Sequence, residues 1–263
     1  MRTVAVLFLC LGVASIAGAQ TASAPPGPAL NRPDFLFGEP NGSVGIRGSW
    51  MFAHGGTACA EPQTCRDIYH FVEDRLTIDP ADFNTGAFAA DVGVGLTPRT
   101  DARFGIEVNR ASLASEYRRL VDNNRRPIRQ TTTLQQVDLS GGIRFALTPR
   151  GRRIGSLAWI PSRVIPFLGA GAGVVWYQLE QRGDFVDEQA PSLPIFTDTL
   201  QSQGFAPSVH VRGGVDVQLH GRWYLTLDGR YLWAAGDLGD DFQGFDPIDL
   251  AGFRFGAGIN ILF

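Results

Sequence analysis

Three residues of this 263-residue sequence, Ser208, His210 and Asp216, are of the types used in nucleophilic hydrolysis. A hydrolase of this kind needs the serine hydroxyl against the imidazole and the imidazole oriented by the carboxylate. Residues two apart in a β-strand share a face, so Ser208 and His210 would be neighbours, with Asp216 further along the same face. Whether these residues could hydrolyse a lipid depends on whether that face of the strand is turned towards the membrane or towards the protein interior.

A second candidate for chemistry is the pair Cys59 and Cys65, which lies between His54 and His70. Two Cys and two His could hold zinc, but the spacing fits no standard zinc pattern. The sequence begins with an export signal, described below, and exported chains meet an oxidising compartment in which disulfides form. We therefore predict a local disulfide between Cys59 and Cys65, with no metal and no cofactor.

Charged residues gather in two segments. Arg118, Arg119, Arg125, Arg126 and Arg129 lie near Tyr117, and arginine forks are suited to phosphate groups. The alternative is a solvated loop, because runs of charge are usually only solvated. Asp237, Asp240, Asp241, Asp246 and Asp249 form an acidic segment whose spacing matches no calcium-loop signature. The net charge of −3 gives no reason to expect nucleic-acid binding.

The first residues form a secretory signal peptide. Arg2 supplies a positive n-region, Val4 to Val13 an apolar run, and Ala17 to Ala19 a small-x-small cleavage pattern. The run is too short for a membrane helix, so we expect cleavage before Gln20 and assign residues 1–19 to the signal peptide. Residues 20–42, rich in Pro, Ala and Gly, are predicted to be a flexible lead-in.

From Ser43 the hydrophobic period is two, which predicts strands. Most of the links between the strands alternate between short turns and long segments. Thr148 to Arg163 is an exception, a long link where a short turn is expected. The eight predicted strands are Ser43 to Ala53, Gly86 to Thr97, Ala102 to Leu113, Thr132 to Leu147, Val164 to Leu179, Pro207 to Leu219, Arg222 to Ala234 and Leu250 to Phe263.

Each of these strands has one apolar and one polar face, a pattern that also suits a soluble barrel. Three features favour a membrane. The polar face carries near-balanced charges, as a closed interior requires. It is also rich in Gly, and aromatic residues mark the strand ends, as in outer-membrane barrels. The predicted lumen charges are Arg47, Asp91, Arg103, Glu107, Asp138, Arg144, Arg212, Asp216, Asp228, Arg230 and Arg254, and the predicted girdle contains Trp50, Trp176, Trp223 and Trp233, with Phe263 at the level of Trp223.

Two stretches carry a resemblance to a known family. Gly252 to Phe263 resembles the last strand of bacterial outer-membrane proteins, and Pro166 to Tyr177 is similar to the Gly-rich strand of small opacity-type and outer-membrane-protein-W-like barrels. Outer-membrane-protein-A-like barrels share the architecture. The resemblance implies that the assembly machinery recognises Phe263. It implies roles from structure to adhesion and small-solute passage, and it brings no catalytic residues.

The sequence thus predicts an all-β protein whose residues 43–263 form an eight-stranded antiparallel transmembrane β-barrel, an up-and-down meander in the outer membrane. Long arginine chains would fill so narrow a lumen, which favours a structural or surface-interaction protein over a narrow pore. A lipid-modifying hydrolase is disfavoured because Ser208 and His210 would face the lumen. Expected partners are outer-membrane lipid, lipopolysaccharide phosphates and the barrel assembly machinery. We also expect the Thr148 to Arg163 link to lie along the inner membrane surface.

Overall fold

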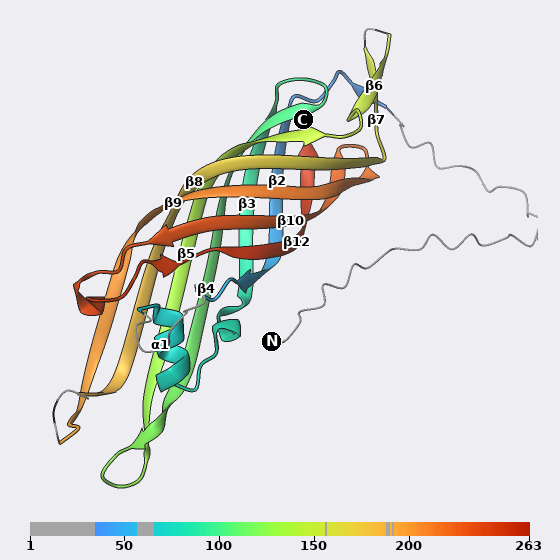
Figure 1. Cartoon of the computed structure of the whole chain (residues 1–263). Coiled ribbons are helices and arrows are strands. Elements are labelled where there is room, and N and C mark those ends of the chain that lie inside the picture. The colour runs from blue at the N-terminus through green and yellow to red at the C-terminus, as the bar shows by residue number, and fades with distance from the viewer. Residues whose placement is uncertain (1–34, 57–65, 156, 188–189, 191) are drawn as a thin grey trace, which may run out of the picture. The chain divides into compact units, whose positions relative to one another are not determined.

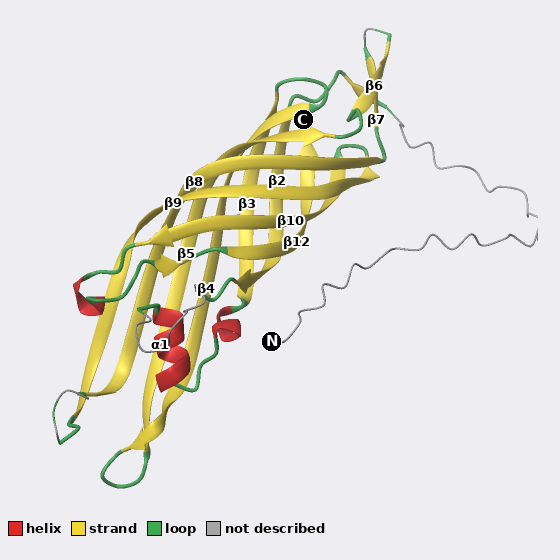
Figure 2. Ribbon diagram, in the orientation of Figure 1, coloured by secondary structure: helices red, strands yellow, loops and turns green. Residues whose placement is uncertain are grey.

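The computed structural model describes residues 35–56, 66–155, 157–187, 190 and 192–263. The signal peptide and the Cys59–Cys65 pair lie outside these residues and stay predictions. Eight long antiparallel strands dominate the fold (Figures 1 and 2). They are β2 (Gly42–Ala53), β3 (Thr85–Gly95), β4 (Thr100–Val121), β5 (Pro127–Ala146), β8 (Val164–Val186), β9 (Ile195–His220), β10 (Trp223–Gly236) and β12 (Gly252–Leu262).

Each long strand pairs with the next one along the chain, and the last one, β12, pairs with the first, β2, in a register that includes Ile259 opposite Ile46. The chain is an eight-stranded antiparallel β-barrel. All eight predicted strands are present, and the predicted meander topology is confirmed. Among the described residues, no helix is both long and apolar enough to cross a membrane.

The barrel has two different ends. At the turn end, β3 joins β4 and β9 joins β10 by tight turns, and the C-terminus lies nearby (Figure 1). At the loop end lie α1 (Ile68–Arg75), the 3-10 helices η1 (Pro80–Phe83) and η2 (Asp240–Phe242), and the short β11 (Ile248–Asp249). A small separate sheet of β1 (Leu36–Phe37), β7 (Ala158–Pro161) and β6 (Gly151–Ile154) stands at the turn end.

Two of the long links predicted as loops are strands instead. β4 and β5 keep one register as far as Glu116 and Arg129 and pair again at Val121 and Pro127, and β8 and β9 remain paired as far as Val186 and Ile195. The barrel wall therefore continues beyond the other strands on this side.

The outer wall changes from apolar to polar within one step of the register. Val108, Val137, Trp176 and Phe205 form one cross-strand row, and the next outward row towards the loop end is Arg110, Gln135, Gln178 and Gln203. On the opposite side Phe52 and Phe253 form a pair, and Tyr231 lies next to Phe253. A continuous apolar band with a sharp edge surrounds the barrel.

Candidate functional site

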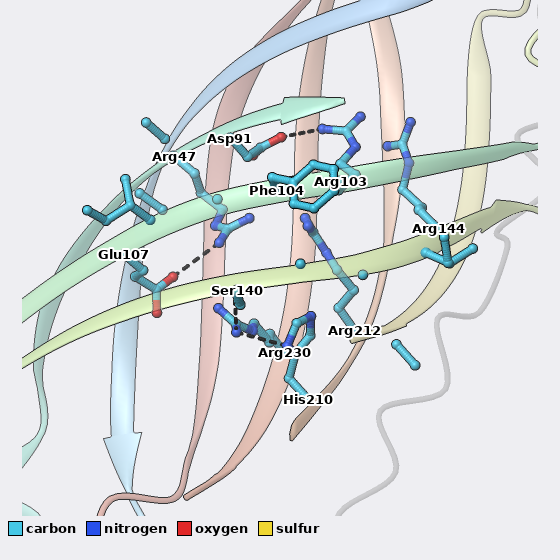
Figure 3. Close-up of a pocket in the computed structure, with 18 residues that line it drawn as sticks. Arg47, Asp91, Arg103, Phe104, Glu107, Ser140, Arg144, His210, Arg212 and Arg230 are labelled. Atoms are coloured by element: carbon cyan, nitrogen blue, oxygen red, sulfur yellow. Dashed lines mark hydrogen bonds and ion pairs between the residues drawn. The ribbon is translucent and has the colours of Figure 1, made fainter. Parts of the chain in front are cut away.

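The lumen holds a network of charged side chains. The structure places all eleven predicted residues on inward-facing positions, where nine are buried and Asp91 and Arg212 are partly buried. Several of them face one another across the barrel in Figure 3. The closest ion pairs among these eleven residues are Arg144–Asp216 at 2.6 Å, Arg230–Asp138 at 2.6 Å, Arg254–Glu107 at 2.6 Å, Arg103–Asp91 at 2.5 Å, Arg212–Asp228 at 3.0 Å and Arg47–Glu107 at 3.1 Å.

Sequence reasoning missed an acidic member of this network. Asp101 was assigned to a tight turn, but β4 begins at Thr100 and Asp101 is its first buried inward residue. Its carboxylate lies 2.7 Å from Arg144 and 3.2 Å from Arg103. The period-two alternation of Asp101 with Arg103 and Glu107 could have revealed it. With Asp101 included, six carboxylates face the six predicted arginines, and Arg150 adds a seventh guanidinium 3.6 Å from Asp101.

The arginines of three adjacent strands lie in one row. Arg230 is opposite Arg212 on one side and Arg254 on the other. Like charges in such positions repel, so their partners must come from elsewhere. Asp138 and Glu107 reach Arg230 and Arg254 from β5 and β4, on the other side of the lumen. These cross-lumen pairs tie distant strands together.

Glycines on β8 leave space for the side chains beside this row of arginines. A Cβ on Gly171 would lie 2.7 Å from Cε1 of His210, and one on Gly169 would lie 3.2 Å from Cγ of Arg212. Within the network there remains a cavity of about 40 Å³, lined by Arg47, Asp91, Glu107 and their neighbours (Figure 3). That volume has room for a few water molecules.

An apolar cluster covers the network at the turn end. Trp159 of β7 is buried against inward-facing side chains of the barrel mouth, with Leu36 packed beside it. The barrel residues of this turn cap are Ala146, Ile165, Tyr224 and Leu262. The link from Thr148 to Arg163, predicted to lie along the membrane surface, instead folds into the β6–β7 hairpin, because Trp159 buries its ring on the mouth. Part of the predicted flexible lead-in takes part, since Leu36 pairs with Trp159.

A second apolar cluster covers the network at the loop end. Residues of α1, η1 and η2, among them Val72, Phe83 and Phe242, pack against Leu134 and Leu232 of the wall. We call this cluster the loop cap. Sequence reasoning missed it because the inner face was treated as polar throughout. Leu134 and Leu232 alternate in phase with the lumen charges of their strands, and Val175 and Leu179 alternate in phase with the inward Gly169 and Gly171 of β8.

Polar contacts hold the loop cap in place. Asp67 caps the start of α1 by accepting a hydrogen bond from the amide of Tyr69 at 2.8 Å. The Tyr69 hydroxyl donates to the carbonyl of Asp249 at 2.8 Å, and burial, with help from the Asp249 and Asp67 carboxylates, raises the pKa of that hydroxyl well above its ordinary value. The cap therefore joins the first long link to the last by a tyrosine that stays protonated.

The arginines suggested as phosphate ligands are partly engaged by this cap. Arg118 lies 3.1 Å from Asp79, and Arg119 lies 3.2 Å from Asp74. Arg129 pairs with Glu116 across the β4–β5 hairpin at 2.9 Å. Three of the five arginines thus have acidic partners within the chain, and phosphate contact stays a prediction.

Truncating the buried Phe83 should open the loop cap without unfolding the barrel. Phe83→Ala removes a ring that is 2% exposed and stacks edge-on with Tyr69 at 5.1 Å, at an expected cost of about 3–5 kcal/mol of local packing. Trypsin should then cut the α1 segment of the folded barrel much faster than in the wild type. The control is Phe71→Ala, because Phe71 is 40% exposed on the same segment. Equal cleavage of both variants and wild type would contradict a packed cap.

The hydrolase residues are not brought together as a catalytic triad. The hydroxyl of Ser208 donates to Asp138 at 3.3 Å, and Nδ1 of His210 lies 3.1 Å from the Arg230 guanidinium. Asp216 accepts from Arg144 and from Thr226, both at 2.6 Å. Its carboxylate is committed to these groups, so it does not orient His210.

The remaining predicted site residues lie on the surface. Trp50, Trp223 and Trp233 are about half exposed, and Trp176 is partly exposed, all on outward faces. In the acidic segment, Asp249 pairs with His54 at 2.7 Å. Within the described part of the chain, no group of three or more His, Cys, Asp or Glu could hold a metal ion.

No family model matches this sequence, and no curated protein matches it. Solved structures with a similar fold include Neisserial surface protein A, at 11% identity and a TM-score of 0.44, covering 84% of this chain and 97% of that one. The outer membrane protein OprG from Pseudomonas aeruginosa has 11% identity and a TM-score of 0.42, covering 86% and 98%. Ail of Yersinia pestis has 10% identity and a TM-score of 0.38, covering 87% and 100%. Likeness this low supports no functional conclusion.

Proposed function

We propose that the protein is an integral outer-membrane barrel whose lumen is closed, and that it displays a rigid, capped loop end outside the cell. The predicted signal peptide and the sharply bounded apolar band support membrane insertion. Long loops of such barrels face the exterior, so the loop cap would lie outside and the turn cap in the periplasm.

The observation that carries the proposal is the balanced charge layer between two apolar caps. Ions crossing the lumen would have to pass Trp159, the paired arginines and the loop cap in turn. Each buried pair would need to be broken, and an unpaired buried charge costs several kcal/mol. The role left to such a barrel is structural or one of surface interaction through its loops.

The test combines fractionation with conductance. We expect the mature protein to stay in the outer-membrane fraction after washing with salt and alkali, and to show no steady single-channel current in planar bilayers. Recovery from the soluble periplasm would contradict the placement. A steady current from the wild type would overturn the closed lumen and favour the narrow pore.

A further inference from the structure

At one point of the loop-end edge of the apolar band, the wall carries a hollow of about 450 Å³, which we call the rim hollow. It is lined by His54, Tyr231, Trp233, Ala235, Asp249 and Ala251. The strand pairing fixes its level. Tyr231 lies beside Phe253 of the apolar band, while Ala235, two steps beyond Trp233, pairs with Asp249. The hollow thus begins in the band and ends in the polar zone above it.

The lining combines an aromatic platform with a polar pair. The rings of Tyr231 and Trp233 lie 4.5 Å apart at an interplanar angle of 56°, and Trp233 is 46% exposed. His54 Nδ1 lies 2.7 Å from the Asp249 carboxylate, and the His54 side chain is 49% exposed. Backbone bonds hold both polar residues, because the His54 amide donates to Ala251 at 3.0 Å and the Asp249 carboxylate accepts from the Ala251 amide at 2.8 Å.

We propose that the rim hollow binds the sugar headgroup of a glycolipid in the surrounding outer leaflet. An exposed indole face offers an apolar surface to the C–H face of a pyranose, as amphipathic rings do at membrane interfaces. The imidazole and carboxylate supply a donor and acceptors for ring hydroxyls. The carboxylate argues against a phosphate as the main ligand, since like charges repel.

The position of the hollow selects a lipid over a soluble sugar. Below it, Phe253 and Phe52 continue the apolar band, on which the acyl chains of the same molecule would lie. A free saccharide would contact only the rim hollow and would gain nothing from the apolar band. This inference rests on the proposed membrane placement. The experiment must therefore distinguish a failure to bind glycolipid from a failure to insert into a membrane.

The test uses folded barrel in nanodiscs of phosphatidylethanolamine doped with lipid A whose two phosphates have been removed, a neutral glucosamine-based glycolipid. Retained lipid is counted by native mass spectrometry. We expect wild type to retain lipid A in preference to phosphatidylglycerol. Trp233→Leu should lower that retention about fivefold, as expected for the loss of one aromatic face. His54→Gln should lower it in the same direction.

The matched control is Trp223→Leu. Trp223 also faces outward on β10 and is 48% exposed, but it stands at the turn end. If both tryptophan variants retain lipid A equally, Trp233 is only a girdle residue and the inference is wrong. Equal retention of phosphatidylglycerol by the wild type, or binding of free glucosamine as strong as that of lipid A, would also overturn it. Failure to enter nanodiscs at all would instead overturn the membrane placement.

Discussion

Arg230→Ala should lower the unfolding temperature of the barrel more than any change on its outer surface. The Arg230 guanidinium lies 2.6 Å from the Asp138 carboxylate, and both side chains are almost wholly buried. Truncation leaves Asp138 charged inside the lumen, where the hydroxyls of Ser140 and Ser208 are its remaining side-chain donors among the residues that the structure describes. An uncompensated buried charge of this kind costs about 3–5 kcal/mol.

A second substitution tests the cause of that loss. Asp138→Asn in the Arg230→Ala background removes the orphaned charge, so it should restore part of the stability. The surface control is Arg129→Ala, whose partner is Glu116 and whose side chain is 74% exposed, and which should cost under about 1 kcal/mol. The measurement is heat-modifiable gel migration against temperature, with urea unfolding in lipid vesicles. A harmless Arg230→Ala, or a double variant no better than the single one, would refute the paired lumen.

Deleting Phe263 should abolish most assembly of the barrel. Phe263 directly follows β12, and its backbone closes the ring by exchanging hydrogen bonds with Gly42, both at 2.9 Å. The resemblance of the last strand to those of outer-membrane proteins also implies that the assembly machinery recognises this residue. We expect the deletion to accumulate unfolded in the periplasm, with loss of the folded band on unheated gels.

Point variants separate recognition from simple loss of apolar surface. Phe255 faces outward on the same strand and is 58% exposed, against 60% for Phe263. Phe263→Ala should therefore reduce folded protein far more than Phe255→Ala, although each removes a ring of equal size and similar exposure. Equal losses of folded protein in the two point variants would show that only the removed hydrophobic area matters. Normal folding of the Phe263 deletion would show that the terminal residue is not needed for assembly.

The two caps bear on the proposed role of the loop end as well as on the closed lumen. Because α1 and η2 pack on the inner wall and Tyr69 bonds the last long link, the described parts of these two links are held by the barrel itself. A partner binding there would lose little entropy in ordering it. This favours a role in which the loop end is recognised as a shaped surface.

The sequence by itself determined the strands, their order and the inward face of each. These follow from local physics, since the period of two assigns every residue of a strand to one face. Arg47, Glu107 and Arg254 could therefore be placed in the lumen without a structure. The residue at which a strand begins or ends is harder to predict from this pattern. For that reason Asp101, the first buried inward residue of β4, is predicted to lie in a turn.

The tertiary structure alone decided which charge meets which, because pairing depends on the stagger of strands around a closed ring. The sequence predicts that Arg212, Arg230 and Arg254 meet Asp216, Asp228 and other acids of the lumen, and Asp228 lies 3.0 Å from Arg212. In the barrel, Arg212, Arg230 and Arg254 lie side by side, so Asp138 and Glu107 come from across the lumen, while Asp216 pairs with Arg144. The caps are equally non-local, since Trp159 and Phe83 are buried only where a distant mouth of the barrel receives them.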